Sequence, residues 1–223
     1  MNARQMTAVT ADLVGSRQAG REDRERIQRG LLAAFDALGE ALGQGLARPI
    51  RMVAGDAFQA LLLRPSAAVD VIQGVQDAVA LLAPRQEILF GVGWGPLSTG
   101  LLGEESRVEE LDGPCFHNAR AALDVAQKDR RWAVFRGFGE APDATLSGLF
   151  HLMGALRSGW TAKQTRYAVD VRRLGRRVDV AREHDVSPSV ITESLQSSHF
   201  DAVRSGEEAA RCLLTTFEAE PSA

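Results

Sequence analysis

The sequence predicts an α+β fold, in which a ferredoxin-like βαββαβ sheet domain precedes an all-α domain with a helix-turn-helix pattern. Two observations support this prediction. Apolar patterns over residues 1–96 follow the order strand, helix, two strands, helix, strand, as in a split βαβ arrangement with both helices on one face of a sheet. From about residue 141 the patterns are helical. We therefore expect a sheet domain at 1–140, a helical domain at 141–217 and a flexible tail at 218–223.

The N-terminal half opens with a short strand at 7–14, whose β-branched residues suit a buried place in a sheet. A helix follows at 24–46, with one apolar face made of Ile27, Leu31, Phe35, Leu38 and Leu42. Residues 51–63 are predicted to form two short strands joined at Gly55-Asp56, because glycine tolerates the positive φ of a tight hairpin turn. A second helix, at 67–82, ends before Pro84.

The next strand, at 88–94, belongs to a stretch with glycines at alternating positions: Gly91, Gly93 and Gly95. The spacing is GxGxG and Pro96 follows in place of a helix, so a dinucleotide-binding motif is not indicated. We interpret these glycines as positions where another backbone packs closely. A helix that begins at Pro114 and a strand at 132–136 complete the predicted sheet domain.

The C-terminal region is predicted to form helices at 146–157, 161–174, 176–185, 188–197 and 202–217. Thr161 and Gln164 have the spacing of a capping box, and Gly175 suits the end of that helix. Residues 178–195 have the layout of a helix-turn-helix, with an apolar residue in the turn. The last helix is a candidate contact for a homodimer.

Composition narrows the class of protein. A chain of 223 residues that is 45% hydrophobic can bury a sizeable core, and a net charge of -3 means that any nucleic-acid binding must come from a local patch. The two cysteines, Cys115 and Cys212, lie far apart and suggest neither a disulfide framework nor a zinc site. No apolar run is long enough for a membrane span and no signal-peptide pattern is present, so we expect a cytoplasmic protein without membrane partners.

Two aspartates form a candidate metal site. Asp12 lies near the end of the first strand and Asp56 at the hairpin tip, and they would converge if the first and third strands are neighbours. Two converging carboxylates repel each other unless a cation neutralises them, and oxygen ligands suit Mg²⁺ or Mn²⁺ with a phosphate as a further ligand. The turn residues Gly15, Ser16 and Arg17 could bind that phosphate. In the alternative interpretation, each aspartate only stabilises its own turn.

A second candidate site is the basic stretch 157–182, which contains eight arginines and lysines against two aspartates. Phosphate contacts supply most of the affinity for DNA, while side chains on a recognition helix reach base edges. The predicted DNA-binding residues are Arg172, Arg173, Arg176, Arg177, Ser189, Thr192 and Gln196. The alternative is a packing or dimerisation module with a solvated basic face.

Four blocks of the sequence, 10–17, 55–61, 91–95 and 113–123, resemble in order the SatD family of bacterial proteins. The order of elements is more remotely similar to the catalytic domains of class III nucleotide cyclases. This resemblance implies metal binding by Asp12 and Asp56 and binding of a nucleotide or other phosphorylated ligand. Asn118 and Arg120, in the first turns of the helix that begins at Pro114, are further candidates for phosphate contacts.

The sequence also departs from the cyclase pattern. Met52 stands where cyclases carry a base-reading lysine, and Ala122 stands where they carry a transition-state arginine, four residues after the asparagine. Arg120 comes two residues too early, which turns it away on a helix. Because stabilisation of phosphoryl charge is usually the largest catalytic contribution, these departures argue against efficient catalysis.

Three functions remain open from the sequence. The first is a DNA-binding bacterial transcription regulator whose cyclase-like domain binds a nucleotide without efficient catalysis. The alternative is a metal-dependent nucleotidyl cyclase or nucleotidyl-transfer enzyme. The third is a non-catalytic interaction scaffold.

Overall fold

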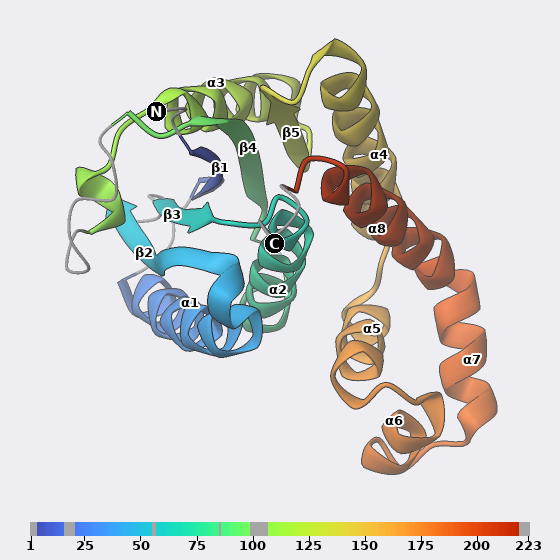
Figure 1. The fold of residues 1–223 in the computed structure, drawn as a ribbon. Helices are drawn as coiled ribbons and strands as arrows, with labels where there is room; N and C mark the ends of the chain where they lie inside the picture. Colours follow the sequence, from blue (N-terminus) through green and yellow to red (C-terminus); the bar gives the residue numbers. More distant parts are fainter. Residues whose placement is uncertain (1–3, 16–20, 55–56, 85, 99–106, 219–223) are drawn as a thin grey trace.

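The computed structural model describes residues 4–15, 21–54, 57–84, 86–98 and 107–218. Within these residues five strands form one sheet in the order β2-β3-β1-β4-β5 (Figure 1). The strands are β1 (Gln5–Leu13), β2 (Leu46–Ala54), β3 (Ala57–Leu62), β4 (Ile88–Pro96) and β5 (Ala133–Arg136). The α-helices are α1 (Arg21–Leu42), α2 (Ala67–Leu82), α3 (Pro114–Asp129), α4 (Glu140–Ser158), α5 (Ala162–Leu174), α6 (Arg177–Glu183), α7 (Pro188–Ser197) and α8 (Phe200–Thr215), with short 3₁₀ turns η2 (Gly43–Gly45) and η3 (Val108–Glu110).

Strand β1 lies at the centre of the sheet. It pairs antiparallel with β3 on one side and with β4 on the other, and β5 joins β4 in parallel. The predicted α+β class and the predicted neighbourhood of the first and third strands are therefore confirmed. The position of β1 between two strands places its C-terminal end in the middle of one edge of the sheet.

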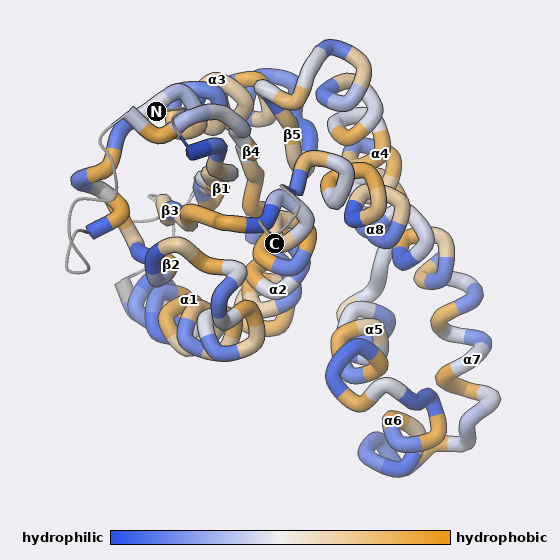
Figure 2. Tube along the Cα trace, viewed as in Figure 1, coloured by the Kyte–Doolittle hydropathy of each residue, from blue (hydrophilic) through white to orange (hydrophobic). Residues whose placement is uncertain are grey.

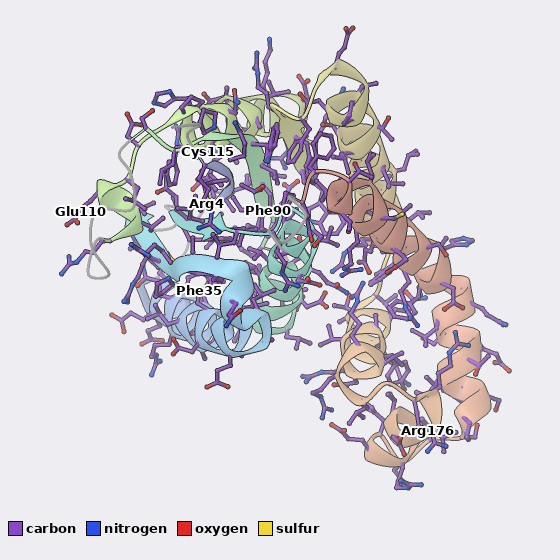
Figure 3. All side chains as sticks on the ribbon, in the orientation of Figure 1. Arg4, Phe35, Phe90, Glu110, Cys115 and Arg176 are labelled. Carbon is purple, nitrogen blue, oxygen red and sulfur yellow. The ribbon has the colours of Figure 1, made fainter. Side chains whose placement is uncertain are left out.

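The two faces of the sheet are covered by different helices. Because side chains alternate along a strand, Val9, Ala11 and Leu13 of β1 face the core formed with α1 and α2, whereas Met6 and Ala8 face α3. Phe35 and Phe90, labelled in Figure 3, belong to the first of these cores. In Figure 2 hydrophobic and hydrophilic positions alternate around α1, as expected for a helix with one buried face. Helix α3 thus covers the face that a two-helix ferredoxin-like sheet leaves open.

The C-terminal region contributes to the same core through α4 and α8, which lie side by side (Figure 1). Phe150 of α4 contacts Phe135 of β5, and Val203 and Leu214 of α8 belong to the core cluster that includes the strands. The apolar face of α8 is therefore buried within the chain. Packing against α4 explains the apolar pattern of α8, and the homodimer stays a prediction.

Helices α5, α6 and α7, with the start of α8, enclose a smaller core made of Tyr167, Ala168, Val171, Val180, Ala181, Ile191, Leu195 and Phe200. The capping box at Thr161 and Gln164 is present, and Gly175 ends α5 with a left-handed φ of 76°. Among the described helices, none is both long and apolar enough to cross a bilayer. The predicted helices are confirmed here, but the helix-turn-helix assignment is not.

Candidate functional site

Asp12 occupies the C-terminal end of β1, at the middle of the sheet edge. Its neighbours in the sheet are Ala57 on β3 and Leu89 on β4. Ala57 follows Asp56 directly in the chain, while Gly55 and Asp56 themselves lie outside the described residues. The pairing of β1 with β3 thus brings Ala57, the residue after Asp56, beside Asp12, as predicted from the order of the strands.

The carboxylate of Asp12 is half-buried and is held from α3. Nε2 of Gln127, in the last turn of that helix, donates a hydrogen bond of 2.7 Å to Oδ2 of Asp12. The chain after β1 is fixed as well, since Nε2 of Gln86 donates to the carbonyl oxygen of Val14 at 2.7 Å. A carboxylate whose direction is set by a neighbouring amide is suited to holding a ligand in one orientation. Gln127 could not be predicted from the sequence, because it belongs to no motif and lies 115 residues from Asp12.

The predicted phosphate-binding turn is described only at its start. Gly15 adopts a left-handed φ of 70°, which fits the predicted turn and which other residues adopt at a cost. Ser16 and Arg17 lie outside the described residues.

Asn118 and Arg120 lie in the first half of α3, away from Gln127. At 1.5 Å per residue, Arg120 is about 10 Å along the helix axis from Gln127. Nδ2 of Asn118 donates to the carbonyl oxygen of Trp94 at 2.9 Å and so ties α3 to β4. Arg120 is exposed and pairs with Asp124 at 3.3 Å. The structure does not bring these two side chains together with Asp12.

The described residues at the end of β1 supply the kind of ligand that a divalent cation prefers, but only one such side chain. Carboxylate oxygens are the ligands that Mg²⁺ and Mn²⁺ prefer, and Asp12 supplies one carboxylate. Within the described part of the chain, no group of three or more His, Cys, Asp or Glu side chains is arranged to hold a metal ion. A cation at this place would therefore depend on Asp12 together with Asp56 and the oxygens of a bound phosphate.

The arginines predicted to bind DNA are engaged in ion pairs within the protein. Arg172 contacts Asp77 of α2 at 2.9 Å and Glu207 of α8 at 2.7 Å, and its side chain is only 14% exposed. Arg173 pairs with Asp170 and Glu183, Arg177 with Asp201, and Arg176 with Asp179. The hydrogen bonds that Arg173 donates to the carboxylates of Glu183 and Asp170 raise the pKa of Arg173. Four of the acidic partners lie outside the basic stretch 157–182, and the fold brings them to the arginines: Asp77, Glu183, Asp201 and Glu207.

The predicted recognition helix is α7. Its hydroxyls bond locally: Thr192 donates to the carbonyl oxygen of Pro188 at 3.0 Å, and the Ser189 hydroxyl lies 2.8 Å from that of Ser187. Gln196 is exposed, and α7 carries no arginine or lysine. Arg176, labelled in Figure 3 at the beginning of α6, lies at the end of the helical cluster away from the sheet. The four arginines predicted to bind DNA are thus paired with acids of the protein itself, and the hypothesis of a DNA-binding regulator is wrong.

The innermost of these ion pairs form a buried cluster, which we call the arginine–acid cluster: Asp77, Arg157, Arg172 and Glu207. Nη2 of Arg157 donates to Asp77 at 2.9 Å, and the guanidinium of Arg157 stacks between the rings of Trp132 and Trp160 at 5.0 and 4.8 Å. Burial lowers the pKa of Arg157 and raises the pKa of Glu207. The cluster joins α2, α4, α5 and α8. Its arginines therefore connect the C-terminal helices α4 and α5 to α2, which covers the sheet.

The model of the SatD family matches residues 6–214, and no curated protein matches the sequence. Similar solved structures include a bacterial light-regulated adenylyl cyclase (10% identity, 60% of this chain and 77% of that chain, TM-score 0.45) and the guanylyl cyclase Cya2 (18%, 55% and 71%, 0.40). A third is the guanylate cyclase domain of RhGC from Catenaria anguillulae in complex with GTP (16%, 55% and 73%, 0.39). At these identities the likeness concerns the fold alone.

Proposed function

The chain belongs to the SatD family, and we propose that its sheet domain is a metal-dependent enzyme of nucleotidyl transfer, whose site lies at the C-terminal end of β1. The observation that carries the proposal is the placement of Asp12. Its half-buried carboxylate is oriented by Gln127 and lies beside Ala57, the residue that follows Asp56. Such a carboxylate at a sheet edge, next to a glycine turn, is a suitable anchor for the phosphates and cation of a nucleotide.

The roles of the residues follow from their chemistry. Asp12 and Asp56 would hold Mg²⁺ or Mn²⁺, and the backbone of the turn that begins at Gly15 would contact a phosphate. A bound cation would supply positive charge to the phosphate oxygens. Gln127 donates to Asp12 and keeps its carboxylate in place, which makes it a positioning residue.

The departures from the cyclase pattern limit which reaction is proposed. Ala122 is fully buried against the sheet with Leu89 and Val134, so α3 offers no room for an arginine at this position. Met52, on β2, packs against the main core and offers no charge to a base. We therefore propose nucleotidyl transfer as the class of reaction, with slower turnover than an enzyme that carries the full set of catalytic residues.

The proposal is tested with the purified full chain, ATP or GTP, and Mg²⁺ or Mn²⁺, by following pyrophosphate release and the nucleotide product. We expect product from the wild type and a loss of at least about 100-fold in Asp12→Asn, since removal of one electrostatic group of a catalytic site costs about this much. Asp36→Asn, an exposed change on α1, is the matched control and should keep full activity. A wild type that forms no product from either nucleotide with either metal would overturn the proposal.

A further inference from the structure

Helix α4 has an outer side that lacks the charges expected of a surface helix. Its inner side, with Leu146, Phe150 and Met153, belongs to the main core. Residues 144–156 include no aspartate, glutamate, lysine or arginine. A helix on the surface of a globular protein normally carries charged and polar residues opposite its buried side, so α4 departs from this pattern.

Two leucines on the outer side of α4 are exposed, one helical turn apart. Leu152 is 65% exposed, the highest value among the large hydrophobic side chains that the structure describes, and Leu156 is 37% exposed. Gly148 lies one turn before Leu152, and a Cβ atom there would meet nothing within 4 Å. Because residues four positions apart lie on the same side of a helix, these three residues form one apolar strip in which a leucine stands beside an open position.

Helix α8 widens this strip. Gly206 of α8 lies against Met153 and Leu149 of α4. Of the residues three or four positions from Gly206, which lie on the same side of the helix, Ala202 and Ala209 are exposed. We call the joint surface the α4–α8 face, and it consists of Gly148, Leu149, Leu152, Leu156, Ala202, Ala209 and Leu213.

The α4–α8 face itself contains no charged residue. Charged side chains of α8 are used on its other sides, where Glu207 contacts Arg172 of α5. Likewise, Arg211 contacts Asp70 of α2. In a twofold-symmetric contact each residue meets the same surface of the other copy, so charges of one sign would lie close to each other. An uncharged face avoids this repulsion.

We propose that the α4–α8 face is the interface of a homodimer, in which α4 of one copy packs antiparallel against α4 of the other. Leu152 of each copy would lie over Gly148 of the other, so that a protruding side chain meets an open position. The exposed Glu140 opens α4, and the exposed Lys163 and Arg166 follow its end. The antiparallel arrangement brings the acidic end of one copy to the basic end of the other.

The size of the face suits a dimer. Helices α4 and α8 have 19 and 16 residues. Two helices of this length, packed about 8–10 Å apart, cover roughly 500 Å² in projection, or roughly 1,000 Å² for both copies, which is where specific interfaces begin. A bilayer fits this face less well, because helices that bind membrane surfaces carry lysines and arginines beside their apolar side, and residues 144–156 have none.

The test measures the mass of the full chain by sedimentation equilibrium at protein concentrations from about 1 to 100 µM. We expect the mass to rise from the 24.1 kDa of one chain to twice this value. An interface at the lower end of the size range should give a dissociation constant of about 1–10 µM.

Leu152→Glu should weaken the dimer at least about 100-fold, because it places two carboxylates close to the symmetry axis. The matched control is Leu32→Glu, which changes a leucine of α1 that is 49% exposed and lies outside the α4–α8 face, and it should dimerise like the wild type.

Chemical crosslinking gives a second measurement that needs no charged substitution. With the exposed Cys212 replaced by serine, a short bismaleimide should join two copies of Leu152→Cys but not two copies of Leu32→Cys. Three results would overturn the proposal: a wild type that stays monomeric at about 100 µM, Leu152→Glu that dimerises as tightly as the wild type, or equal crosslinking of the two cysteine variants. The first result would leave the face for a different protein or a membrane. Neither measurement involves a nucleotide, so failure here is separate from failure of the nucleotidyl-transfer proposal.

Discussion

The side chain of Asp77 holds two arginines at once. Arg157 of α4 and Arg172 of α5 both bond to it, and all three side chains are at most 14% exposed. Buried charges are costly to desolvate, so they are tolerated only when they are paired and hydrogen-bonded. Both arginines are paired in this way: Asp77 contacts Arg157 and Arg172, and Glu207 also contacts Arg172.

Removal of Asp77 should therefore be strongly destabilising. We predict that Asp77→Asn lowers the free energy of unfolding by about 3–5 kcal/mol, because it leaves two buried guanidinium groups without their shared anion. Urea denaturation followed by circular dichroism measures this change. Asp124→Asn, which breaks the exposed pair with Arg120, is the control and should cost at most about 0.5 kcal/mol. Equal effects of the two variants would contradict the account of the cluster.

The two cysteines should differ in reactivity. Cys115 is fully buried and burial raises its pKa to about 11, whereas Cys212 is exposed. A raised pKa keeps the thiol protonated at pH 8, and the thiolate is the reactive form. We predict that iodoacetamide at pH 8 modifies one cysteine of the native protein, Cys212, and both after denaturation. Mass spectrometry of the digested protein identifies the site, and modification of native Cys115 would show that α3 is not packed as described.

Contacts between individual side chains could be predicted from the sequence only where the two residues are close in sequence or where the order of the strands places them together. The neighbourhood of Asp12 and the hairpin followed from the order of the elements. Gln127 and Asp77 could not be predicted, because the contacts that they make join residues 115, 80 and 95 positions apart. Distant partners also explain why Arg172 and Arg177, which look like part of a DNA-binding surface in the sequence, are paired with acids in the fold.

At the scale of elements, the packing of α3 on β4 depends on glycine. A Cβ atom on Gly91 would lie 2.1 Å from the carbonyl oxygen of Ala119, and one on Gly93 would lie 2.1 Å from the backbone nitrogen of the same residue. Distances below 3.0 Å cannot occur without movement of the backbone. The interpretation of these glycines as close-packing positions is confirmed, and it explains why α3 can lie flat on the sheet and carry Gln127 to Asp12.

Substitution of Gly93 should test this packing directly. We predict that Gly93→Ala lowers the free energy of unfolding by about 1–3 kcal/mol or more, because α3 must move away from the strand. Gly148→Ala is the matched control, since a Cβ atom there meets nothing within 4 Å and alanine favours a helix by about 0.5–1 kcal/mol. The two variants should move the thermal midpoint in opposite directions. A neutral Gly93→Ala would contradict the close approach of α3.

Element boundaries with local signals were predictable. The capping box of α5, the glycine after it and the proline that opens α7 set their helix ends within a few residues. The first helix was predicted to run to 46 but ends at Leu42, because Gly43–Gly45 forms a 3₁₀ turn and β2 begins at Leu46. The sequence did carry a signal for this end, because Gly43, which adopts a left-handed φ of 47°, directly follows Leu42. The prediction followed the apolar spacing instead, which Leu46 continues.

At the scale of the whole molecule, the sheet and the C-terminal helices share one core. Leu146, Phe150, Val203 and Leu214 belong to the same cluster as the strand residues, and the arginine–acid cluster ties α5 to α2. The division at residue 140 remains a prediction from composition. A homodimer also remains a prediction, now without a role for the buried face of α8.

The shared core has a measurable consequence. We predict that the full chain unfolds in one calorimetric transition whose calorimetric and van't Hoff enthalpies agree, because neither part can lose its structure without exposing the common cluster. Asp77→Asn should shift this transition to lower temperature. Two separate transitions in the wild type would show that the sheet domain and the helices are energetically independent.

The central claim, that the end of β1 is a metal-dependent nucleotide site, is tested most directly by crystals of the full chain soaked with GTP and Mn²⁺. Anomalous diffraction locates the manganese. The account predicts a manganese peak within about 2.5 Å of a carboxylate oxygen of Asp12, with the nucleotide phosphates beside the turn that begins at Gly15, and loss of the peak in Asp12→Asn. A nucleotide bound elsewhere, or crystals without manganese at Asp12, would contradict the claim.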